Sequence, residues 1–239
     1  MSQSFTDMDE IVKYIGGFEK RLRLLEEQRN SLVISYLTLR TVVGVLGMSL
    51  PFVVSLGALV LFQTGFQGSI SAYYHTGMRD TFVGTLWVIG FFLFSYKGYE
   101  RADNVAGNLA CLFAVGAALF PTSPDGATEA GVLLIGVIHA VFTVLLFITL
   151  VYFSLCLFTK TNPLLTPTKQ KLQRNRVYRA CGYTMSVCIL LIAIYVFLPR
   201  DFASIFTAYK PVYWLEALAI LAFGISWFTK GEAILKDES

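Results

Sequence analysis

Six long apolar runs constrain this chain more than any other feature. A helix that crosses a membrane needs about 20 apolar residues, at a rise of about 1.5 Å per residue. Charged residues make up only 15% of the 239 residues, and they gather between the apolar runs. We therefore expect an all-α, polytopic membrane protein with a six-helix transmembrane domain over residues 33–230. The six predicted membrane-spanning helices are residues 42–63, 81–96, 104–120, 131–158, 180–198 and 212–229.

The lysines and arginines are unevenly distributed among the segments that flank these runs. Sixteen of the 19 lie before the first run, in alternate connections or after the last run, which leaves Arg79, Arg200 and Lys210 for the other connections. Basic residues concentrate on the cytoplasmic side of membrane proteins. The bias predicts that both termini, including a tail at 231–239, are cytoplasmic, and we expect a multi-pass protein of a bacterial inner membrane.

The net charge of +3 is too small to indicate a nucleic-acid partner. Membrane lipid is the partner that we expect. The cysteines fall within or at the edges of apolar runs, and we interpret them as small hydrophobic residues rather than as a disulfide or metal site. They are Cys111, Cys156, Cys181 and Cys188.

Residues 1–32 are predicted to form a separate amphipathic cytoplasmic helix, because apolar residues recur there at spacings of three and four. These residues are Met8, Ile11, Ile15, Phe18, Leu22, Leu25 and Leu32. Three interpretations stay open. The helix packs beneath its own bundle, or it lies on the inner membrane surface with its basic residues near anionic headgroups. Alternatively, residues 8–32 form a coiled coil that makes the protein a homo-oligomer.

Small residues and one proline mark the predicted packing of the runs. Ala106, Ala110, Ala114 and Ala118 recur every four residues, and small residues at that spacing let two helices approach closely. We predict a helix–helix contact along this face. Pro51 lies inside the first run, where it is expected to kink the helix.

Polar residues stand out in and beside the apolar runs, where ionisable groups are costly and usually functional. The connection "SISAYYHTGMRD" spans residues 69–80, and if it is helical, Ser71, His75 and Arg79 share one face. One hypothesis is that the polar residues converge on an outward-facing cavity, and the alternative is that each is satisfied locally. The candidate ligand-binding residues are Ser71, His75, Arg79, Asp80, His139 and Glu216.

Two pairings follow from these positions. A carboxylate at Glu216 needs a nearby cation to stay charged in a membrane, and Arg79 is the candidate for that cation. The same arginine would suit an anionic headgroup of a ligand. His139 needs a hydrogen-bond partner inside the fourth run, and Thr143, one helical turn further on, is one candidate.

A metal site is the alternative use of the same residues. His75 and His139 are the two histidines of the chain, and with Asp80 and Glu216 they could form a two-histidine carboxylate zinc site with one open position. The chain lacks the closely spaced histidine pairs that usually mark such sites. We therefore expect no metal and no cofactor.

The favoured function is non-enzymatic: binding or handling of a lipid or small hydrophobic ligand, with no catalytic residue identified. The alternatives are a metal-dependent intramembrane lipid hydrolase and an oligomeric channel or small transporter.

Two resemblances to known families bear on these alternatives. The pattern Ser71-x-x-x-His75 beside a helix end resembles the first motif of the CREST membrane hydrolases, a group that includes alkaline ceramidases and adiponectin receptors. This resemblance implies an intramembrane zinc site built by a serine, an aspartate and three histidines, which cleaves lipid amides. The sequence departs from that pattern because no histidine follows His139.

The second resemblance covers residues 40–230. The order of the runs, with "AALFPTSPDG" ending the third and "GVIHAVFT" opening the fourth, resembles bacterial uncharacterised relatives of the DRAM and GPI-anchor-maturation (Frag-type) membrane proteins. It implies a six-helix membrane architecture and no particular activity.

Overall fold

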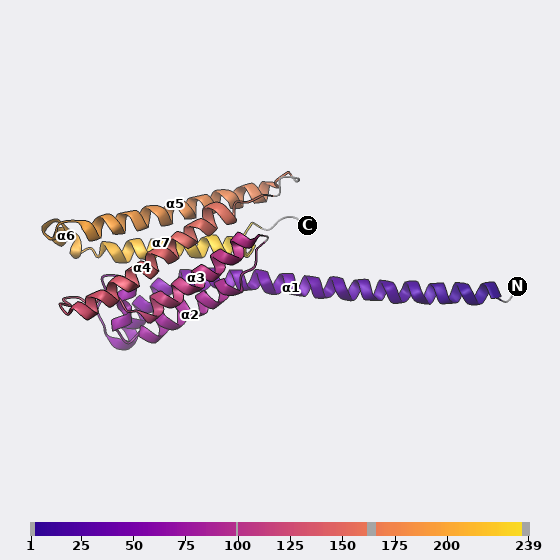
Figure 1. The fold of residues 1–239 in the computed structure, drawn as a ribbon, viewed down its shortest axis with the longest axis horizontal. Coiled ribbons are helices and arrows are strands. Elements are labelled where there is room, and N and C mark those ends of the chain that lie inside the picture. Colours follow the sequence, from indigo (N-terminus) through magenta and orange to yellow (C-terminus); the bar gives the residue numbers. More distant parts are fainter. Residues whose placement is uncertain (1–2, 99, 162–165, 236–239) are drawn as a thin grey trace. The chain divides into compact units, whose positions relative to one another are not determined.

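The computed structural model describes residues 3–98, 100–161 and 166–235, and these residues form helices and connections without any strand (Figure 1). Each predicted apolar run is helical. The elements are α1 (Gln3–Phe62), the 3₁₀ helix η1 (Ser71–His75), α2 (Arg79–Ser95), α3 (Arg101–Leu119), α4 (Ala130–Tyr152), the π-helical η2 (Phe153–Leu157), α5 (Lys169–Phe197), α6 (Arg200–Thr207) and α7 (Pro211–Lys230). The short helix α6 is an addition, since its residues belong to no apolar run.

The chain divides into two compact units, Met1–Leu39 and Arg40–Ser239. The predicted N-terminal helix and the first apolar run are parts of one helix, α1, which does not end at Gly16 and Gly17. The side chains of residues 1–17, including Met8, Ile11 and Ile15, lie outside the part of the chain that the structure describes.

Connections of the Arg40–Ser239 unit gather at two opposite ends of its helices. At one end, which we call the η1 end, the α1–α2 connection meets the α3–α4 connection, where His75 Nε2 lies 2.7 Å from the Thr122 carbonyl oxygen. At the other end, which we call the Lys230 end, the α2–α3 and α4–α5 connections meet through an ion pair of Lys160 Nζ and Glu100 Oε2 at 2.7 Å. Successive helices therefore run in alternating directions.

Small residues bring two pairs of helices into close contact, α1 with α7 and α2 with α3. A side chain at Gly44 of α1 would place its Cβ 2.7 Å from the Gly224 oxygen of α7, and one at Gly90 of α2 would lie 3.4 Å from the Ala114 methyl group of α3. The alanine repeat of α3 is buried along its whole length, so the predicted helix–helix contact is confirmed. The repeat comprises Ala106, Ala110, Ala114 and Ala118.

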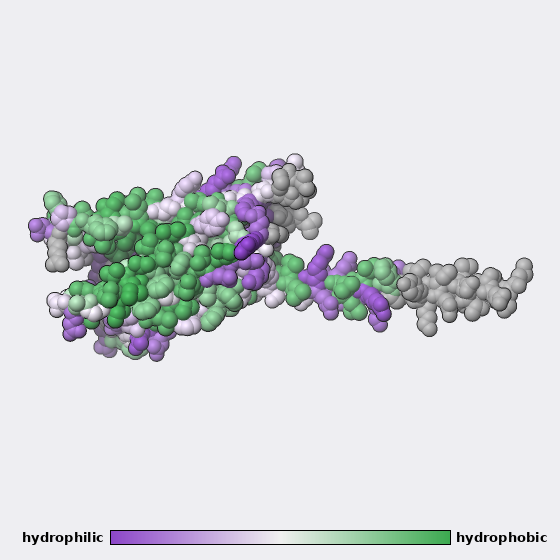
Figure 2. All heavy atoms as spheres, in the orientation of Figure 1, coloured by the Kyte–Doolittle hydropathy of each residue, from purple (hydrophilic) through white to green (hydrophobic). Residues whose placement is uncertain are grey.

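Apolar side chains also cover the outside of the helices. On the face drawn in Figure 2, hydrophobic side chains occupy the middle of the Arg40–Ser239 bundle, and polar ones gather toward its ends. Five of the exposed apolar residues of α4 recur at spacings of three and four, which places these five on one face of that helix. They are Leu134, Val137, Val141, Val144 and Ile148.

Among the described residues, five helices are long and apolar enough to cross a membrane. These are Phe18–Phe62, Arg101–Leu119, Ala130–Leu157, Lys169–Phe197 and Pro211–Lys230. Helix α2, with 17 residues, is equally apolar in character but shorter.

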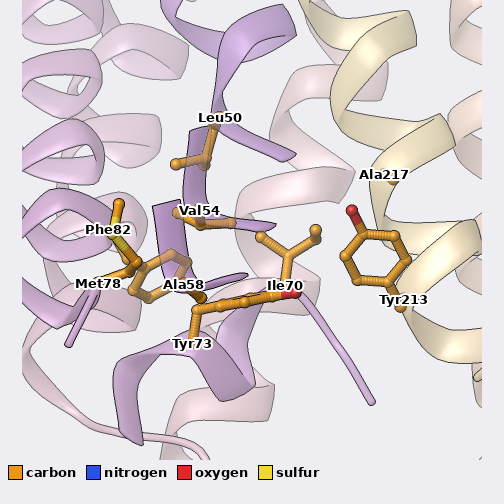
Figure 3. Packing of buried hydrophobic residues seen from close by; sticks show 9 residues of the cluster. All are labelled: Leu50, Val54, Ala58, Ile70, Tyr73, Met78, Phe82, Tyr213 and Ala217. Atoms are coloured by element: carbon orange, nitrogen blue, oxygen red, sulfur yellow. The ribbon is translucent and has the colours of Figure 1, made fainter. Parts of the chain in front are cut away.

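A buried cluster fixes the η1 end. Tyr73 of η1 is fully buried there, and the side chains of α1, α2 and α7 close around it (Figure 3). The ring centroids of Tyr73 and Tyr213 lie 6.4 Å apart in an edge-to-face arrangement. The cluster comprises Leu50, Val54, Ala58, Ile70, Tyr73, Met78, Phe82, Tyr213 and Ala217.

Candidate functional site

A cavity of about 70 Å³ lies within the Arg40–Ser239 unit. Its walls come mainly from α2, α4 and α7, and each helix contributes one stripe of side chains at spacings of three and four, as one face of a helix does. The apolar lining residues are Gly47, Leu50, Ile70, Phe82, Leu86, Ile89, Leu93, Ala117, Leu146, Phe147, Leu150, Ile220 and Phe223.

The polar lining is confined to four residues: Ser71, His139, Thr143 and Glu216. On α4, the lining runs from His139 to Leu150, a length of about 16 Å at the rise of an α-helix. The polar residues lie toward the η1 end of this stretch, since Ser71 belongs to η1 itself and His139 and Glu216 lie in the first halves of their helices. The cavity thus has one polar end and a long apolar remainder.

Glu216 links α7 to η1. Its carboxylate accepts a hydrogen bond from the backbone N–H of Ile70 at 2.5 Å and a second from the N–H of Ser71. The first N–H groups of any helix have no partner within it, and a carboxylate satisfies them well because the helix dipole favours negative charge there. A reciprocal bond runs from the Tyr213 N–H, in the first turn of α7, to the Gly68 oxygen at 3.0 Å.

His139 closes the end of α3. Its Nδ1 lies 2.9 Å from the Ala117 oxygen and 2.7 Å from the Phe120 oxygen. Because carbonyl oxygens only accept hydrogen bonds, Nδ1 carries the proton and satisfies carbonyls that the end of α3 leaves without a helical partner. In the neutral ring Nε2 is then an acceptor, and the hydroxyl of the predicted partner Thr143 lies 3.3 Å from it.

The other three predicted residues do not line the cavity. His75, Arg79 and Asp80 are exposed. Arg79 donates to the Tyr74 hydroxyl at 3.0 Å and stacks on its ring, with 4.7 Å from the guanidinium carbon to the ring centroid. Asp80 lies in the first turn of α2, where the helix dipole favours a carboxylate.

The predicted pairing of Arg79 with Glu216 is wrong. The Glu216 carboxylate accepts hydrogen bonds from backbone N–H groups, and the Arg79 guanidinium donates a hydrogen bond to the Tyr74 hydroxyl. The predicted common face of Ser71, His75 and Arg79 required a continuous helix from Ser71 to Arg79. The segment is instead a short 3₁₀ helix that ends at His75 and a separate helix that begins at Arg79. Ser71 and Arg79 consequently belong to two elements. Arg79 does not line the cavity.

The described residues contain no group of three or more His, Cys, Asp and Glu side chains that could hold a metal ion. Each histidine already uses one ring nitrogen as a donor to a carbonyl oxygen, His75 to Thr122 and His139 to the end of α3. His75 thus contacts the α3–α4 connection, and His139 contacts the end of α3 where that connection begins.

Sequence reasoning missed an aromatic cluster at the Lys230 end. Trp227 of α7 is fully buried there. Its ring centroid lies 5.2 Å from that of Tyr96, 5.4 Å from that of Phe153 and 5.2 Å from that of Phe158. Lys230 Nζ lies 5.2 Å from the Phe158 centroid. Aromatic residues near the ends of apolar runs are typical of the membrane interface, so the sequence pattern alone does not distinguish a buried cluster from an interfacial belt.

No family model matches this chain, and the searches of curated proteins and of solved structures found no significant match either.

Proposed function

We propose that the Arg40–Ser239 unit is an integral membrane domain that binds one apolar chain, of a lipid or a small hydrophobic molecule, in its internal cavity. In this proposal α1, α2, α3, α4, α5 and α7 cross the bilayer. The η1 end faces outward, and both termini face the cytoplasm of a bacterial cell. The exposed apolar face of α4 supports the membrane placement, because contiguous apolar surface of this size is rare on soluble monomers. Helix α2 is at the short end of the range for a membrane-spanning helix.

The contents of the cavity follow from the cost of leaving it empty. If the cavity of about 70 Å³ stayed empty, the loss of stability would be on the order of 2 kcal/mol. That amount is a substantial fraction of the stability of a typical domain. Water needs two to four polar partners, and the lining offers these only at one end. An alkyl chain suits the apolar remainder.

The polar end favours a ligand head that donates hydrogen bonds. His139 presents an acceptor nitrogen and Glu216 a carboxyl group that is already acting as an acceptor. An alcohol or an amine would find acceptors there, whereas a carboxylate or phosphate head would meet like charge and lone pairs. The observation that carries the proposal is this combination: a long apolar cavity closed at one end by acceptor groups.

Photolabelling of the purified full-length protein tests the proposal. The probe is a long-chain alkyl alcohol with a diazirine near the end of its chain, and the matched probe carries a carboxylate head instead. Leu146→Trp fills the cavity, while Leu134→Trp adds the same ring to the exposed face of the same helix. We expect Leu146→Trp to lower labelling by the alcohol about tenfold and Leu134→Trp to leave it unchanged.

Two results would contradict the proposal. Equal labelling of the Leu146→Trp and Leu134→Trp proteins would show that the probe binds the outer surface rather than the cavity. Stronger labelling by the carboxylate probe than by the alcohol would show that the head chemistry is wrong.

The relationship to the Frag-type membrane proteins remains a prediction from sequence. The hydrolase alternative has its own test, because it requires stoichiometric zinc in the purified protein that is lost when His75 and His139 are both changed to alanine.

A further inference from the structure

We infer that the N-terminal part of α1 pairs with the same segment of a second copy of this chain, as a parallel two-stranded coiled coil. The Met1–Leu39 unit is a single helix over its described residues. Phe18, Leu22, Leu25 and Leu32 lie along one stripe of it, and they are between 45% and 71% exposed. A helix that leaves such a stripe uncovered gains stability by burying it against a partner.

The spacing of the stripe is that of a coiled coil. With Met8 as position a of a seven-residue repeat, the d positions are occupied by Ile11, Phe18, Leu25, Leu32 and Leu39. The a positions are occupied by Met8, Ile15, Leu22, Arg29 and Tyr36. The register holds for more than four repeats, and Arg29 is its one charged member. A strict a/d stripe over that length predicts a coiled coil.

Features beside the stripe agree with this register. Gly16 and Gly17 fall at positions b and c, away from the contact. A polar residue at a single a position, as at Arg29, usually fixes register at some cost in stability.

Charges flanking the stripe select a second copy rather than a membrane surface. Within residues 18–33 there are four basic and three acidic side chains, so the segment has little net attraction to anionic lipid. In a parallel pair, a residue at position g faces the e position of the following repeat in the partner. Arg21 occupies g and Glu26 the following e, so each pair of helices gains two such opposite-charge contacts.

The parallel orientation rests on the proposed membrane placement, because two copies inserted with the same sidedness present their N-terminal helices in the same direction. Two helices in parallel register place each d residue against its own counterpart. That geometry makes the inference testable without knowledge of the cavity ligand.

Cysteine cross-linking of the full-length protein in membranes tests the contact. We expect Leu25→Cys, at position d, to give a disulfide-linked dimer as the main product under mild oxidation. Glu27→Cys, two residues away at the outward position f, should give no more dimer than the unmodified chain with its four native cysteines. The absence of dimer above background for Leu25→Cys would overturn the inference, as would equal cross-linking at both positions.

A charge-reversal cycle tests the register in the same membranes. Arg21→Glu and Glu26→Arg should each weaken dimerisation about tenfold, because attraction becomes repulsion at two contacts. The double variant should recover most of the lost affinity. Residues 21 and 26 are five apart and do not neighbour each other on one helix, so recovery must come from contact between copies. A double variant no better than either single variant would contradict the register.

Discussion

Replacing Trp227 by alanine is expected to destabilise the Arg40–Ser239 unit by about 3–5 kcal/mol. Trp227 is fully buried at the Lys230 end. Its ring makes edge contacts with Tyr96 of the α2–α3 connection, Phe153 of η2 and Phe158 of the α4–α5 connection. Removing it leaves a large void between three elements and loses aromatic contacts worth about 0.5–1.5 kcal/mol each. Its removal therefore weakens the packing of α7 against the α2–α3 connection and against the segment that follows α4.

The measurement is thermal unfolding in a fixed detergent, with two matched variants. Trp214→Ala removes the same ring from a position on α7 that is 61% exposed, and its cost should stay below about 1 kcal/mol. Trp227→Phe should cost much less than the alanine variant, because the indole N–H of Trp227 has no hydrogen-bond partner among the described residues. Equal losses for Trp227→Ala and Trp214→Ala would show that the cluster does not form.

Glu216→Leu is expected to cost about 2–4 kcal/mol. The carboxylate accepts the N–H groups of Ile70 and Ser71, and an apolar side chain of similar size would leave both donors buried without a partner. Each unsatisfied donor costs about 1–3 kcal/mol. The loss should appear first as a loosening of η1 from α7, because these bonds join the two elements.

Glu216→Gln is the matched variant, since its amide oxygen still accepts a hydrogen bond from one of these N–H groups. Its cost should be about 1 kcal/mol. Thermal unfolding gives the ranking, and hydrogen exchange at Ile70 and Ser71 locates the change. If Glu216→Gln and Glu216→Leu proved equally destabilising with unchanged exchange at η1, the capping role assigned to Glu216 would be incorrect.

The sequence predicts the helices well because hydrocarbon-facing helices must be apolar along their whole length. The buried contact along the alanine repeat of α3 was equally predictable, since four small residues at a spacing of four usually mark close packing of two helices. The 3₁₀ helix η1 was not predictable from the sequence. Its twelve-residue connection has no repeat that distinguishes one helical turn from another, and the proposed face of Ser71, His75 and Arg79 depended on that distinction.

The candidate site was predictable only in its polar part. His139, Glu216 and Ser71 attracted attention because polar groups beside hydrocarbon need partners, and all three line one cavity. The apolar walls could not be identified, because a stripe such as Leu146 and Leu150 has the same sequence pattern whether it faces a cavity or a neighbouring helix. The backbone N–H groups of Ile70 and Ser71, which donate to Glu216, cannot be predicted from a pattern of side chains.

The most direct test of the central claim is to identify which residues the alkyl diazirine alcohol labels in the intact protein. The probe should mark residues deep in the cavity on two different helices, Leu150 of α4 and Phe223 of α7, and excess unlabelled long-chain alcohol should suppress both. Labelling confined to exposed residues of α4 such as Leu134 and Val141, without suppression, would contradict a cavity that binds an apolar chain.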